Sequence, residues 1–532
     1  MFSCWFTQYF CSVRIISYLL CFLSISAFSQ VTLSSSAVNF GDVFTNESKE
    51  VGVDVTNITS TNLTVSEIVI YNDGFTYKPL TNNVIEPNKS QKIRVTFAPR
   101  HNVVYNSELI FSLSDGSEHR IDLKGNGRYT DTYYDATFNK SYQDLKDELK
   151  SIISAGYVNY GYNGARDKMY GDIDNVSGQV TCVYTGRVAT FNTRAGATSQ
   201  NFNCEHTWPQ SLFNQNEPER ADIHHLFSTD DNANGKRGNL AFGVVSNASW
   251  SEGGSKLGNG VFEPRDEQKG ATARAMLYFV IRYQDYGNFI DNQETTLVNW
   301  HTNFEPSAAE IARNERVFFY QKNRNPFVDH PEFAERISKY GSTDTKPIVK
   351  NASVLQTQLS YNQVTPSDER TFYVCNTGNQ KLEGFSVSTS VGNAFIKSFE
   401  NAMEEGEASK IIIGFNNLPN GNYADSLIIN LNAQSGQRFS IPIQFGIGTN
   451  NTTSTIANQL QVRYNQSNQK IEFIDGPQGL NEVQVYTIAG KRVFNEISTS
   501  FTDISTVGYN PGVYFVVVSS ESDVYTSKIL VY

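Results

Sequence analysis

The residues best suited to chemistry lie in the stretch NFNCEHTWPQSLF (201–213), where Glu205 stands directly before His206. The chain has only seven histidines, and most of them fall between positions 205 and 330: His206, His224, His225, His301 and His330. A carboxylate can bind a hard metal cation, and an imidazole can accept a proton near neutral pH. The middle of the chain is therefore where a catalytic site is expected.

Positioning these two side chains requires a strand that stops. In a regular strand, Glu205 and His206 would point to opposite faces, so a shared site needs the strand to end or bulge there. Pro209 gives a reason for the strand to end.

A second polar segment, DIHHLFSTDDNANGKRGN (222–239), follows closely. Its first part predicts a short strand with His224 and His225 on opposite faces, and its second part predicts a turn into a short helix that bears Asn234. Two strands and a helix, with a histidine on the first strand and an asparagine on the helix, form a small metal-holding unit.

Four segments in order resemble the bacterial endonuclease I family of ββα-metal (His-Me finger) nucleases: CEHTWPQS, DIHHLFSTDDNANGKRGNLAFG, FEPRDEQKGATARAMLYFVIRY and NRNPFVDHPEF. The resemblance implies that His206 is the general base and that Glu205 and Asn234 bind a divalent metal. One carboxylate and one amide leave most of the coordination sphere to water and phosphate, which suits Mg²⁺, with Ca²⁺ or Mn²⁺ as other candidates. The implied reaction is phosphodiester hydrolysis to a 5′-phosphate and a 3′-hydroxyl.

The segment between the base and the second strand departs from the family pattern. Better-known members have a long insertion there with an arginine that supports the transition state, whereas Asp222 follows His206 closely in this chain. Arg220 is the arginine in that gap, and Arg237 comes just after Asn234. Both are candidates for the missing charge.

The remaining polar residues of the segment are expected to support the site. Asp222 and Asn239 are expected to fix the finger through hydrogen bonds. His224 and His225 are expected to be structural, with one facing the core and the other the rim.

Two other interpretations of the polar residues stay open. A zinc site could be formed by four residues whose side chains strand alternation would separate: Cys204, His206, His224 and His225. Four basic residues at the start of a predicted helix and along it form either a solvated face or a set of phosphate contacts: Arg265, Lys269, Arg274 and Arg282.

Length and charge limit what the whole chain can be. A chain of 532 residues is too long for one core, and at about 150 residues per domain it predicts three or four domains. The net charge of −11 excludes a general binder of polyanions, so contact with nucleic acid would need a local basic site.

Hydrophobic periodicity divides the chain. Residues 31–127 and 346–447 alternate with period two and resemble immunoglobulin-like β-sandwiches, through runs such as KIRVTFAP and RTFYVCNTGNQ. Residues 128–343 carry helical spacing and form the predicted α+β His-Me finger nuclease domain. Residues 456–532, with IAGKRV, GVYF and SKILVY, resemble the C-terminal sorting domain of the type IX secretion pathway and predict a small C-terminal β-sandwich.

Residues 1–30 are typical of an export signal, with an apolar run and a small-residue cleavage site after Ser29 or Gln30. The alternative is a membrane anchor, but the run is short for a span and no later stretch is apolar for long enough. Cleavage would leave three cysteines, of which Cys182 and Cys204 could pair or could both be small buried residues.

Together these features predict a secreted, metal-dependent endonuclease that acts on DNA or RNA with little sequence specificity. It would pass through the periplasm of a Gram-negative bacterium to the cell surface or the exterior, with secretion machinery reading its C-terminal domain and no membrane span after signal cleavage. One alternative is a surface adhesin with an inactive nuclease-like domain. A second is a zinc hydrolase with another substrate.

Overall fold

The structure is a computed structural model that describes residues 30–284, 287–431, 435–448, 461–465, 468–474, 481–487, 492–498, 503–507, 509, 512–519 and 524–531. The expected export signal over residues 1–30 lies outside these residues, except for Gln30. The chain forms two compact units, Met1–Ile447 and Gly448–Tyr532.

The first sandwich contains the alternating runs identified in the sequence. Its sheets have the strand orders β1-β3-β7-β5 and β2-β9-β8-β4-β6. Ile93, Val95 and Phe97 are all buried between the sheets, so the predicted period-two strand is confirmed. The strands are β1 (Val31–Leu33), β2 (Ala37–Phe44), β3 (Lys49–Asn57), β4 (Leu63–Ile70), β5 (Phe75–Tyr77), β6 (Val84–Ile85), β7 (Ser90–Phe97), β8 (Val104–Leu113) and β9 (Glu118–Arg128).

A second pair of sheets follows the helical region, with strand orders β19-β21-β26-β24 and β20-β28-β27-β23, and encloses a separate apolar core. Phe372 and Val374 on one sheet and Ile441 and Ile443 on the other are buried in it. The strands are β19 (Ala352–Val354), β20 (Leu359–Tyr361), β21 (Glu369–Asn376), β22 (Leu382–Glu383), β23 (Ser386–Thr389), β24 (Ala394–Phe399), β25 (Ala402–Met403), β26 (Ala408–Phe415), β27 (Gly421–Asn430) and β28 (Arg438–Ile447).

The two sandwiches pack against each other through buried carboxylates. Glu118 accepts hydrogen bonds from the Tyr373 amide at 2.7 Å and from Gln356 Nε2 at 2.9 Å. Glu108 accepts a bond from the Ala408 amide at 3.3 Å, while its Oε2 is buried without a partner. Burial raises the pKa of Glu108 to about 8 and that of Glu118 to about 7.

This interface predicts that the docked sandwiches lose stability as the pH rises. The carboxyl pKa values are raised above the ordinary 4.5, so docking stability is complete below about pH 4.5 and falls as the pH rises through 7 to 8. We expect thermal unfolding of the full chain to show a loss on the order of 3 kcal/mol between mildly acidic and mildly alkaline buffer. Glu108→Gln should flatten this dependence, and an unchanged pH profile in that variant would contradict it.

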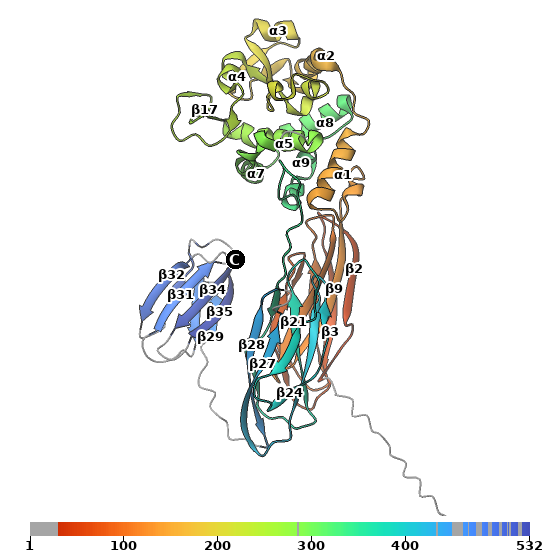
Figure 1. Ribbon diagram of the computed structural model, residues 1–532, viewed down its shortest axis with the longest axis vertical. Helices are drawn as coiled ribbons and strands as arrows, with labels where there is room; N and C mark the ends of the chain where they lie inside the picture. The colour runs from red at the N-terminus through yellow and green to blue at the C-terminus, as the bar shows by residue number, and fades with distance from the viewer. Residues whose placement is uncertain are drawn as a thin grey trace, which may run out of the picture. The chain divides into compact units, whose positions relative to one another are not determined.

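The helical region, which lies between the two sandwiches in the sequence, has α5 at its centre, with α1, α7 and α9 around it (Figure 1). The helical spacing of segments 142–156, 266–287 and 307–323 predicts three helices, and the structure has α1, α5 and α8 within these segments. The helices are α1 (Tyr142–Ser154), α2 (Gly161–Lys168), α3 (Arg194–Ser199), α4 (Asp231–Arg237), α5 (Asp266–Tyr283), α6 (Gly287–Asp291), α7 (Glu294–Asn303), α8 (Ala308–Gln321) and α9 (Pro326–Asp329). The strands are β10 (Asn175–Val176), β11 (Gln179–Thr181), β12 (Val188–Thr190), β13 (Phe202–His206), β14 (Leu226–Asp230), β15 (Ala241–Phe242), β16 (Trp250–Glu252), β17 (Ser255–Gly258) and β18 (Val261–Glu263).

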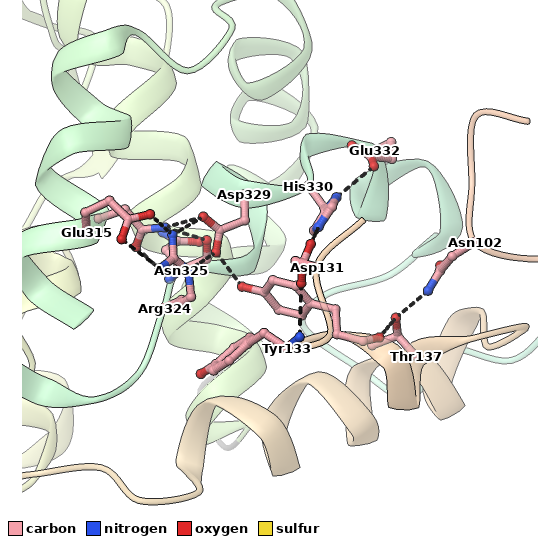
Figure 2. A network of polar contacts seen from close by, with 12 residues as sticks. Asn102, Asp131, Tyr133, Thr137, Glu315, Arg324, Asn325, Asp329, His330 and Glu332 are labelled. Carbon is pink, nitrogen blue, oxygen red and sulfur yellow. Dashed lines mark hydrogen bonds and ion pairs between the residues drawn. The ribbon is translucent and has the colours of Figure 1, made fainter. Parts of the chain in front are cut away.

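A polar network connects the helical region to the first sandwich (Figure 2). Asn102, on the sandwich, donates to Thr137 Oγ1 at 2.9 Å. Nearby, His330 lies 2.7 Å from Asp131 and 3.1 Å from Glu332. Burial lowers the pKa of His330, but the two carboxylates more than offset this and raise it overall. Two carboxylates therefore hold His330 in place and favour its charged form.

The second unit contains its own small core, which includes Ile471, Val485, Val516 and Val518. Its sheets have the strand orders β29-β30-β33 and β32-β31-β34-β35. The strands are β29 (Gln461–Asn465), β30 (Lys470–Ile474), β31 (Asn481–Thr487), β32 (Arg492–Ser498), β33 (Ile504–Ser505), β34 (Gly512–Ser519) and β35 (Val524–Val531). Throughout the described residues, no helix has the length and hydropathy needed to cross a bilayer.

Candidate active site

A two-stranded hairpin followed by a helix carries the candidate residues. β13 pairs antiparallel with β14 in a regular register that ends at His206 opposite Leu226. α4 begins directly after β14, because the Asp230 side chain accepts the amide hydrogens of Asn232 and Ala233 at 2.9 and 3.2 Å and caps the helix. The order of strand, strand and helix agrees with the sequence prediction.

The second strand starts later than predicted. His224 and His225 lie in a 3-10 turn (Ile223–His225) and not on β14, because the Asp222 carboxylate accepts the His224 amide hydrogen and holds a tight turn. Both rings are buried, so the expectation that one of them faces the rim was wrong. Burial lowers the pKa of each to about 4.

Glu205 is buried and held from one side. Its Oε1 accepts a hydrogen bond from Tyr184 at 2.7 Å and forms an ion pair with Arg237 Nε at 3.2 Å. Burial raises the pKa of the Glu205 carboxyl, and Arg237 opposes the rise. Among the described residues, Oε2 has no hydrogen bond or ion pair, so one carboxylate oxygen is open to a ligand.

Arg237 is one of the most deeply buried side chains, with 1% of its surface exposed. Besides Glu205, its guanidinium donates to the carbonyl oxygens of His206, at 3.2 Å, and Thr207. It lies over the Phe242 ring at 4.7 Å. Arg237 therefore ties α4 to the end of β13.

His206 sits at the end of β13 among aromatic rings. Its Nε2 lies 3.1 Å from the Arg220 carbonyl oxygen, which can only accept, so Nε2 carries the proton and Nδ1 has the free lone pair. The ring centroids of Tyr162 and His225 lie 5.2 and 5.4 Å away. Burial, with His225 and the nearby arginines, lowers the pKa of His206 well below its ordinary value, so the ring is neutral at pH 7.

Asn234 lies on the same side of the hairpin as Glu205. Its Nδ2 donates to Asn203 Oδ1 at 2.5 Å, and Asn203 shares a strand face with Glu205 because they are two residues apart. Asn234 also lies one helical turn before Arg237, the partner of Glu205. In the part of the chain that is described, Asn234 Oδ1 has no partner.

Glu205 and His206 leave the strand in opposite directions, because the ladder has no bulge between them. The two side chains also contact different residues, as opposite directions require. The strand does end at His206, as Pro209 suggested, and Arg237 joins the two residues through the Glu205 side chain and the His206 carbonyl.

The donor set fits a hard divalent cation better than zinc. Glu205 Oε2 and Asn234 Oδ1 are oxygen donors without partners among the residues that the structure describes. Carboxylate and amide oxygens are ligands of Mg²⁺ and Ca²⁺. Within the described ranges, no three His, Cys, Asp or Glu side chains gather as they would around a metal, and this includes the alternative zinc set. Cys182 and Cys204 are both buried and unpaired.

Asp222 is the centre of a buried network behind the site. Its Oδ2 accepts hydrogen bonds from Tyr278 and Arg282, both at 2.9 Å, and from Tyr283 at 3.0 Å. Although burial opposes ionisation, Arg282 and the other donors lower the pKa of Asp222 to about 2. Asn239, in contrast, is exposed, and no side-chain hydrogen bond involves it in the described chain.

The basic residues of α5 are neither a solvated face nor free to bind phosphate. Arg274 is buried against Glu310 at 2.7 Å, and Arg282 is buried against Asp222. At the start of α8, the Ser307 hydroxyl accepts the Glu310 amide hydrogen. The acidic partners lie far away in sequence, so no local signal could reveal these pairs.

Arg220 is half-buried and differs from these arginines. Its guanidinium carbon lies 4.4 Å from the centroid of the Tyr162 ring, and it has no ion pair among the described residues. Sequence reasoning did not identify Tyr162 or Tyr184, whose contacts with His206 and Glu205 depend on the fold.

Three regions of the chain match known protein families. Residues 141–332 match the family description Endonuclease I, residues 29–126 match the HYDIN/CFA65/VesB-like Ig-like domain, and residues 456–532 match the secretion system C-terminal sorting domain. The last match places the chain among proteins sorted to the cell surface or the exterior.

Two relatives are extracellular ribonucleases. The one from Bacillus subtilis is 31% identical over 229 residues, which cover 39% of this chain and 78% of the relative. The one from Bacillus amyloliquefaciens is 31% identical over 228 residues, with the same shares covered. Among solved structures, the Vibrio cholerae VesB protease is 19% identical over 18% of this chain and 31% of that one, with a TM-score of 0.16, which carries no functional argument.

The nuclease region thus has the family's segments in order and most of the length of two nuclease relatives. The chain belongs to the endonuclease I family.

Proposed function

We propose that this protein is an exported, metal-dependent endonuclease of the His-Me finger type that hydrolyses phosphodiester bonds of DNA or RNA with little sequence specificity. The observation that carries the proposal is the state of His206. The Arg220 carbonyl holds the proton on Nε2, burial keeps the ring neutral, and Nδ1 is left as a base at the end of the hairpin. His225 and His301 also bond a backbone carbonyl through Nε2, but the Nδ1 atom of each is buried.

In the proposed reaction, His206 Nδ1 takes a proton from a water molecule as the water oxygen attacks phosphorus. The bond from phosphorus to the 3′ oxygen breaks, and that oxygen leaves and is protonated from solvent. The products are a 5′-phosphate and a 3′-hydroxyl. Because Nε2 stays bonded to the Arg220 carbonyl, the protonated ring keeps its orientation until it returns the proton to solvent.

Glu205 and Asn234 would hold the metal ion through Glu205 Oε2 and Asn234 Oδ1, with Mg²⁺ as the first candidate and Ca²⁺ or Mn²⁺ as alternatives. When bound, such an ion neutralises charge on the phosphoryl group and on the departing oxygen. Tyr184 and Arg237 fix the Glu205 carboxylate, so its free oxygen keeps one direction.

We assign the two candidate arginines different roles. Arg237 is fully buried and bonded to protein groups, so it acts as a positioning residue. Arg220 is half-buried and has no carboxylate partner in the described part of the chain, and its backbone orients His206, so it is the better candidate to contact phosphate. Asp222 and His225 hold the backbone behind the base.

Both kinds of nucleic acid are candidate substrates. The relatives from Bacillus are named ribonucleases, so RNA is a candidate substrate as well as DNA. The secretion machinery would recognise the C-terminal domain, residues 456–532, during export.

Incubation of the secreted protein with plasmid DNA and with RNA tests the proposed function directly. We expect both to be cut with divalent metal present and neither to be cut in excess chelator. The cut ends should require no kinase treatment before ligation on the 5′ side. Full activity in excess chelator, or 5′-hydroxyl ends, would contradict the mechanism.

A further inference from the structure

Two arginines near His206 lie on one aromatic ring and differ from most arginines of the domain in having no carboxylate partner among the described residues. Arg166, on α2, and Arg220 place their guanidinium carbons 4.1 and 4.4 Å from the centroid of the same ring, Tyr162. That ring lies beside His206, with centroids 5.2 Å apart. Arg166 was not among the residues that sequence reasoning selected.

Neither guanidinium has an anionic partner among the described residues. Arg166 donates only to Asn163 Oδ1, at 2.6 Å, and its Nε is buried without a hydrogen bond. Arg220 Nε is also buried without a partner. The acid next to Arg166 along the chain, Asp167, pairs with Arg194 at 2.7 Å, and Glu217 is exposed and accepts the Tyr162 amide hydrogen at 3.0 Å.

Most other arginines of the domain have a carboxylate partner or, like Arg316 and Arg336, donate to backbone carbonyl oxygens. Arg237, Arg274 and Arg282 are buried and each has a carboxylate partner, at 3.2, 2.7 and 2.9 Å. Pairing is the usual condition of a buried charge, because an unpaired one loses its hydration without compensation. Two unpaired like charges on one aromatic ring therefore mark a place where an anion is missing from the protein itself.

We propose that Arg166 and Arg220 together bind one phosphate group of the substrate strand adjacent to the scissile bond, with Tyr162 as the platform that holds both guanidiniums beside His206. This inference rests on the proposed nuclease function. Arginine suits the role because its planar donors match the oxygens of a phosphate, and stacking on a ring fixes the plane of each guanidinium.

The arrangement also connects binding with the base. Arg220 contacts His206 through its carbonyl and Tyr162 through its side chain. A phosphate that binds the Arg220 side chain is therefore held at a fixed position relative to His206 Nδ1. Arg166 adds a second donor set from a different element, α2, and restricts how the strand can rotate. Arg166 is thus a phosphate-binding residue and Tyr162 a positioning residue.

Binding of a labelled single-stranded oligonucleotide to the full chain carrying His206→Ala, measured by fluorescence anisotropy over a range of salt, tests the proposal. We expect Arg166→Ala to weaken binding roughly tenfold. The slope of log affinity against log salt should fall by about 0.7, the value for one phosphate contact on a single strand. The matched control is Arg194→Ala, because Arg194 already pairs with Asp167 at 2.7 Å.

A chemical double-mutant cycle locates the contact. In a series of oligonucleotides, one uncharged methylphosphonate replaces the phosphate at each position in turn. The chain that keeps Arg166 should bind more weakly to the oligonucleotide with the replacement at one position beside the cleavage point. At that position, Arg166→Ala should add little further loss. Arg166→Gln is the second variant, since it keeps a donor for Asn163 and packing on Tyr162 without the charge.

The outcomes separate this inference from the proposed function. If the wild-type chain neither binds nor cuts nucleic acid, the proposed function fails. If it does both, but Arg166→Gln and Arg194→Ala bind equally well with equal salt slopes, the two-arginine phosphate site is overturned. Free inorganic phosphate could also weaken oligonucleotide binding equally in the chain that keeps Arg166 and in Arg166→Gln. That result would show that the anion held is not the strand's phosphate.

Discussion

His206→Ala is expected to lower the rate of phosphodiester hydrolysis by about 10² to 10⁴, the usual contribution of a general base. The ring contacts Tyr162 and His225 and has no ion pair among the described residues, so its removal should leave the hairpin and the metal ligands in place. The variant should therefore still bind nucleic acid and Mg²⁺. Single-turnover cleavage at saturating enzyme measures the loss at the chemical step.

Two comparisons make this result specific. His119→Ala changes a histidine of the first sandwich and should cut at the wild-type rate. Added imidazole should restore part of the activity of His206→Ala, because it can enter the vacated space and accept the proton. A folded His206→Ala variant that cuts within a few-fold of wild type would mean that His206 is structural and that another group is the base.

Asn234→Ala is expected to raise the Mg²⁺ concentration needed for half-maximal activity by at least about 10- to 100-fold, since even an outer-shell partner of a metal is worth that much. Asn234 is half-exposed, so this change tests the ligand without damage to the core. Glu205→Ala would be a less clean test, because it leaves the guanidinium of Arg237 buried and unpaired. Titration of activity with Mg²⁺ is the measurement.

Lys236→Ala is the matched control for Asn234→Ala, because Lys236 is exposed on the same helix. Excess Mg²⁺ should recover much of the activity of Asn234→Ala, which separates weakened metal binding from misfolding. If Asn234→Ala and Lys236→Ala show the same Mg²⁺ requirement as wild type, Asn234 is not a ligand.

Much of the fold follows from local patterns. Leu145, Leu149 and Ile153 recur at helical spacing and are all buried on α1, because an amphipathic helix buries one stripe whatever it packs against. Ile93, Val95 and Phe97 do the same at period two on β7. These predictions succeed because helix and strand periods depend on neighbouring residues alone.

Only part of the candidate site could be predicted from such local patterns. Adjacent Glu205 and His206, with Asn234 on a following helix, could be selected from residue types and from the family resemblance. The turn at His224 and His225 could not be foreseen, since alternation predicts a strand there. It forms because Asp222 is ionised and held by Tyr278 and Arg282, which are more than fifty residues away along the chain.

By itself, the sequence determined which residues could do the chemistry, the order of the elements that carry them, and the export-related C-terminal domain. The tertiary structure alone decided which charges are already satisfied. It paired Arg237 with Glu205 and Arg274 with Glu310, and it left Arg166 and Arg220 unpaired around Tyr162. The physical reason is that an ion pair depends on separation in space, and the chain brings distant residues together only after its cores have packed.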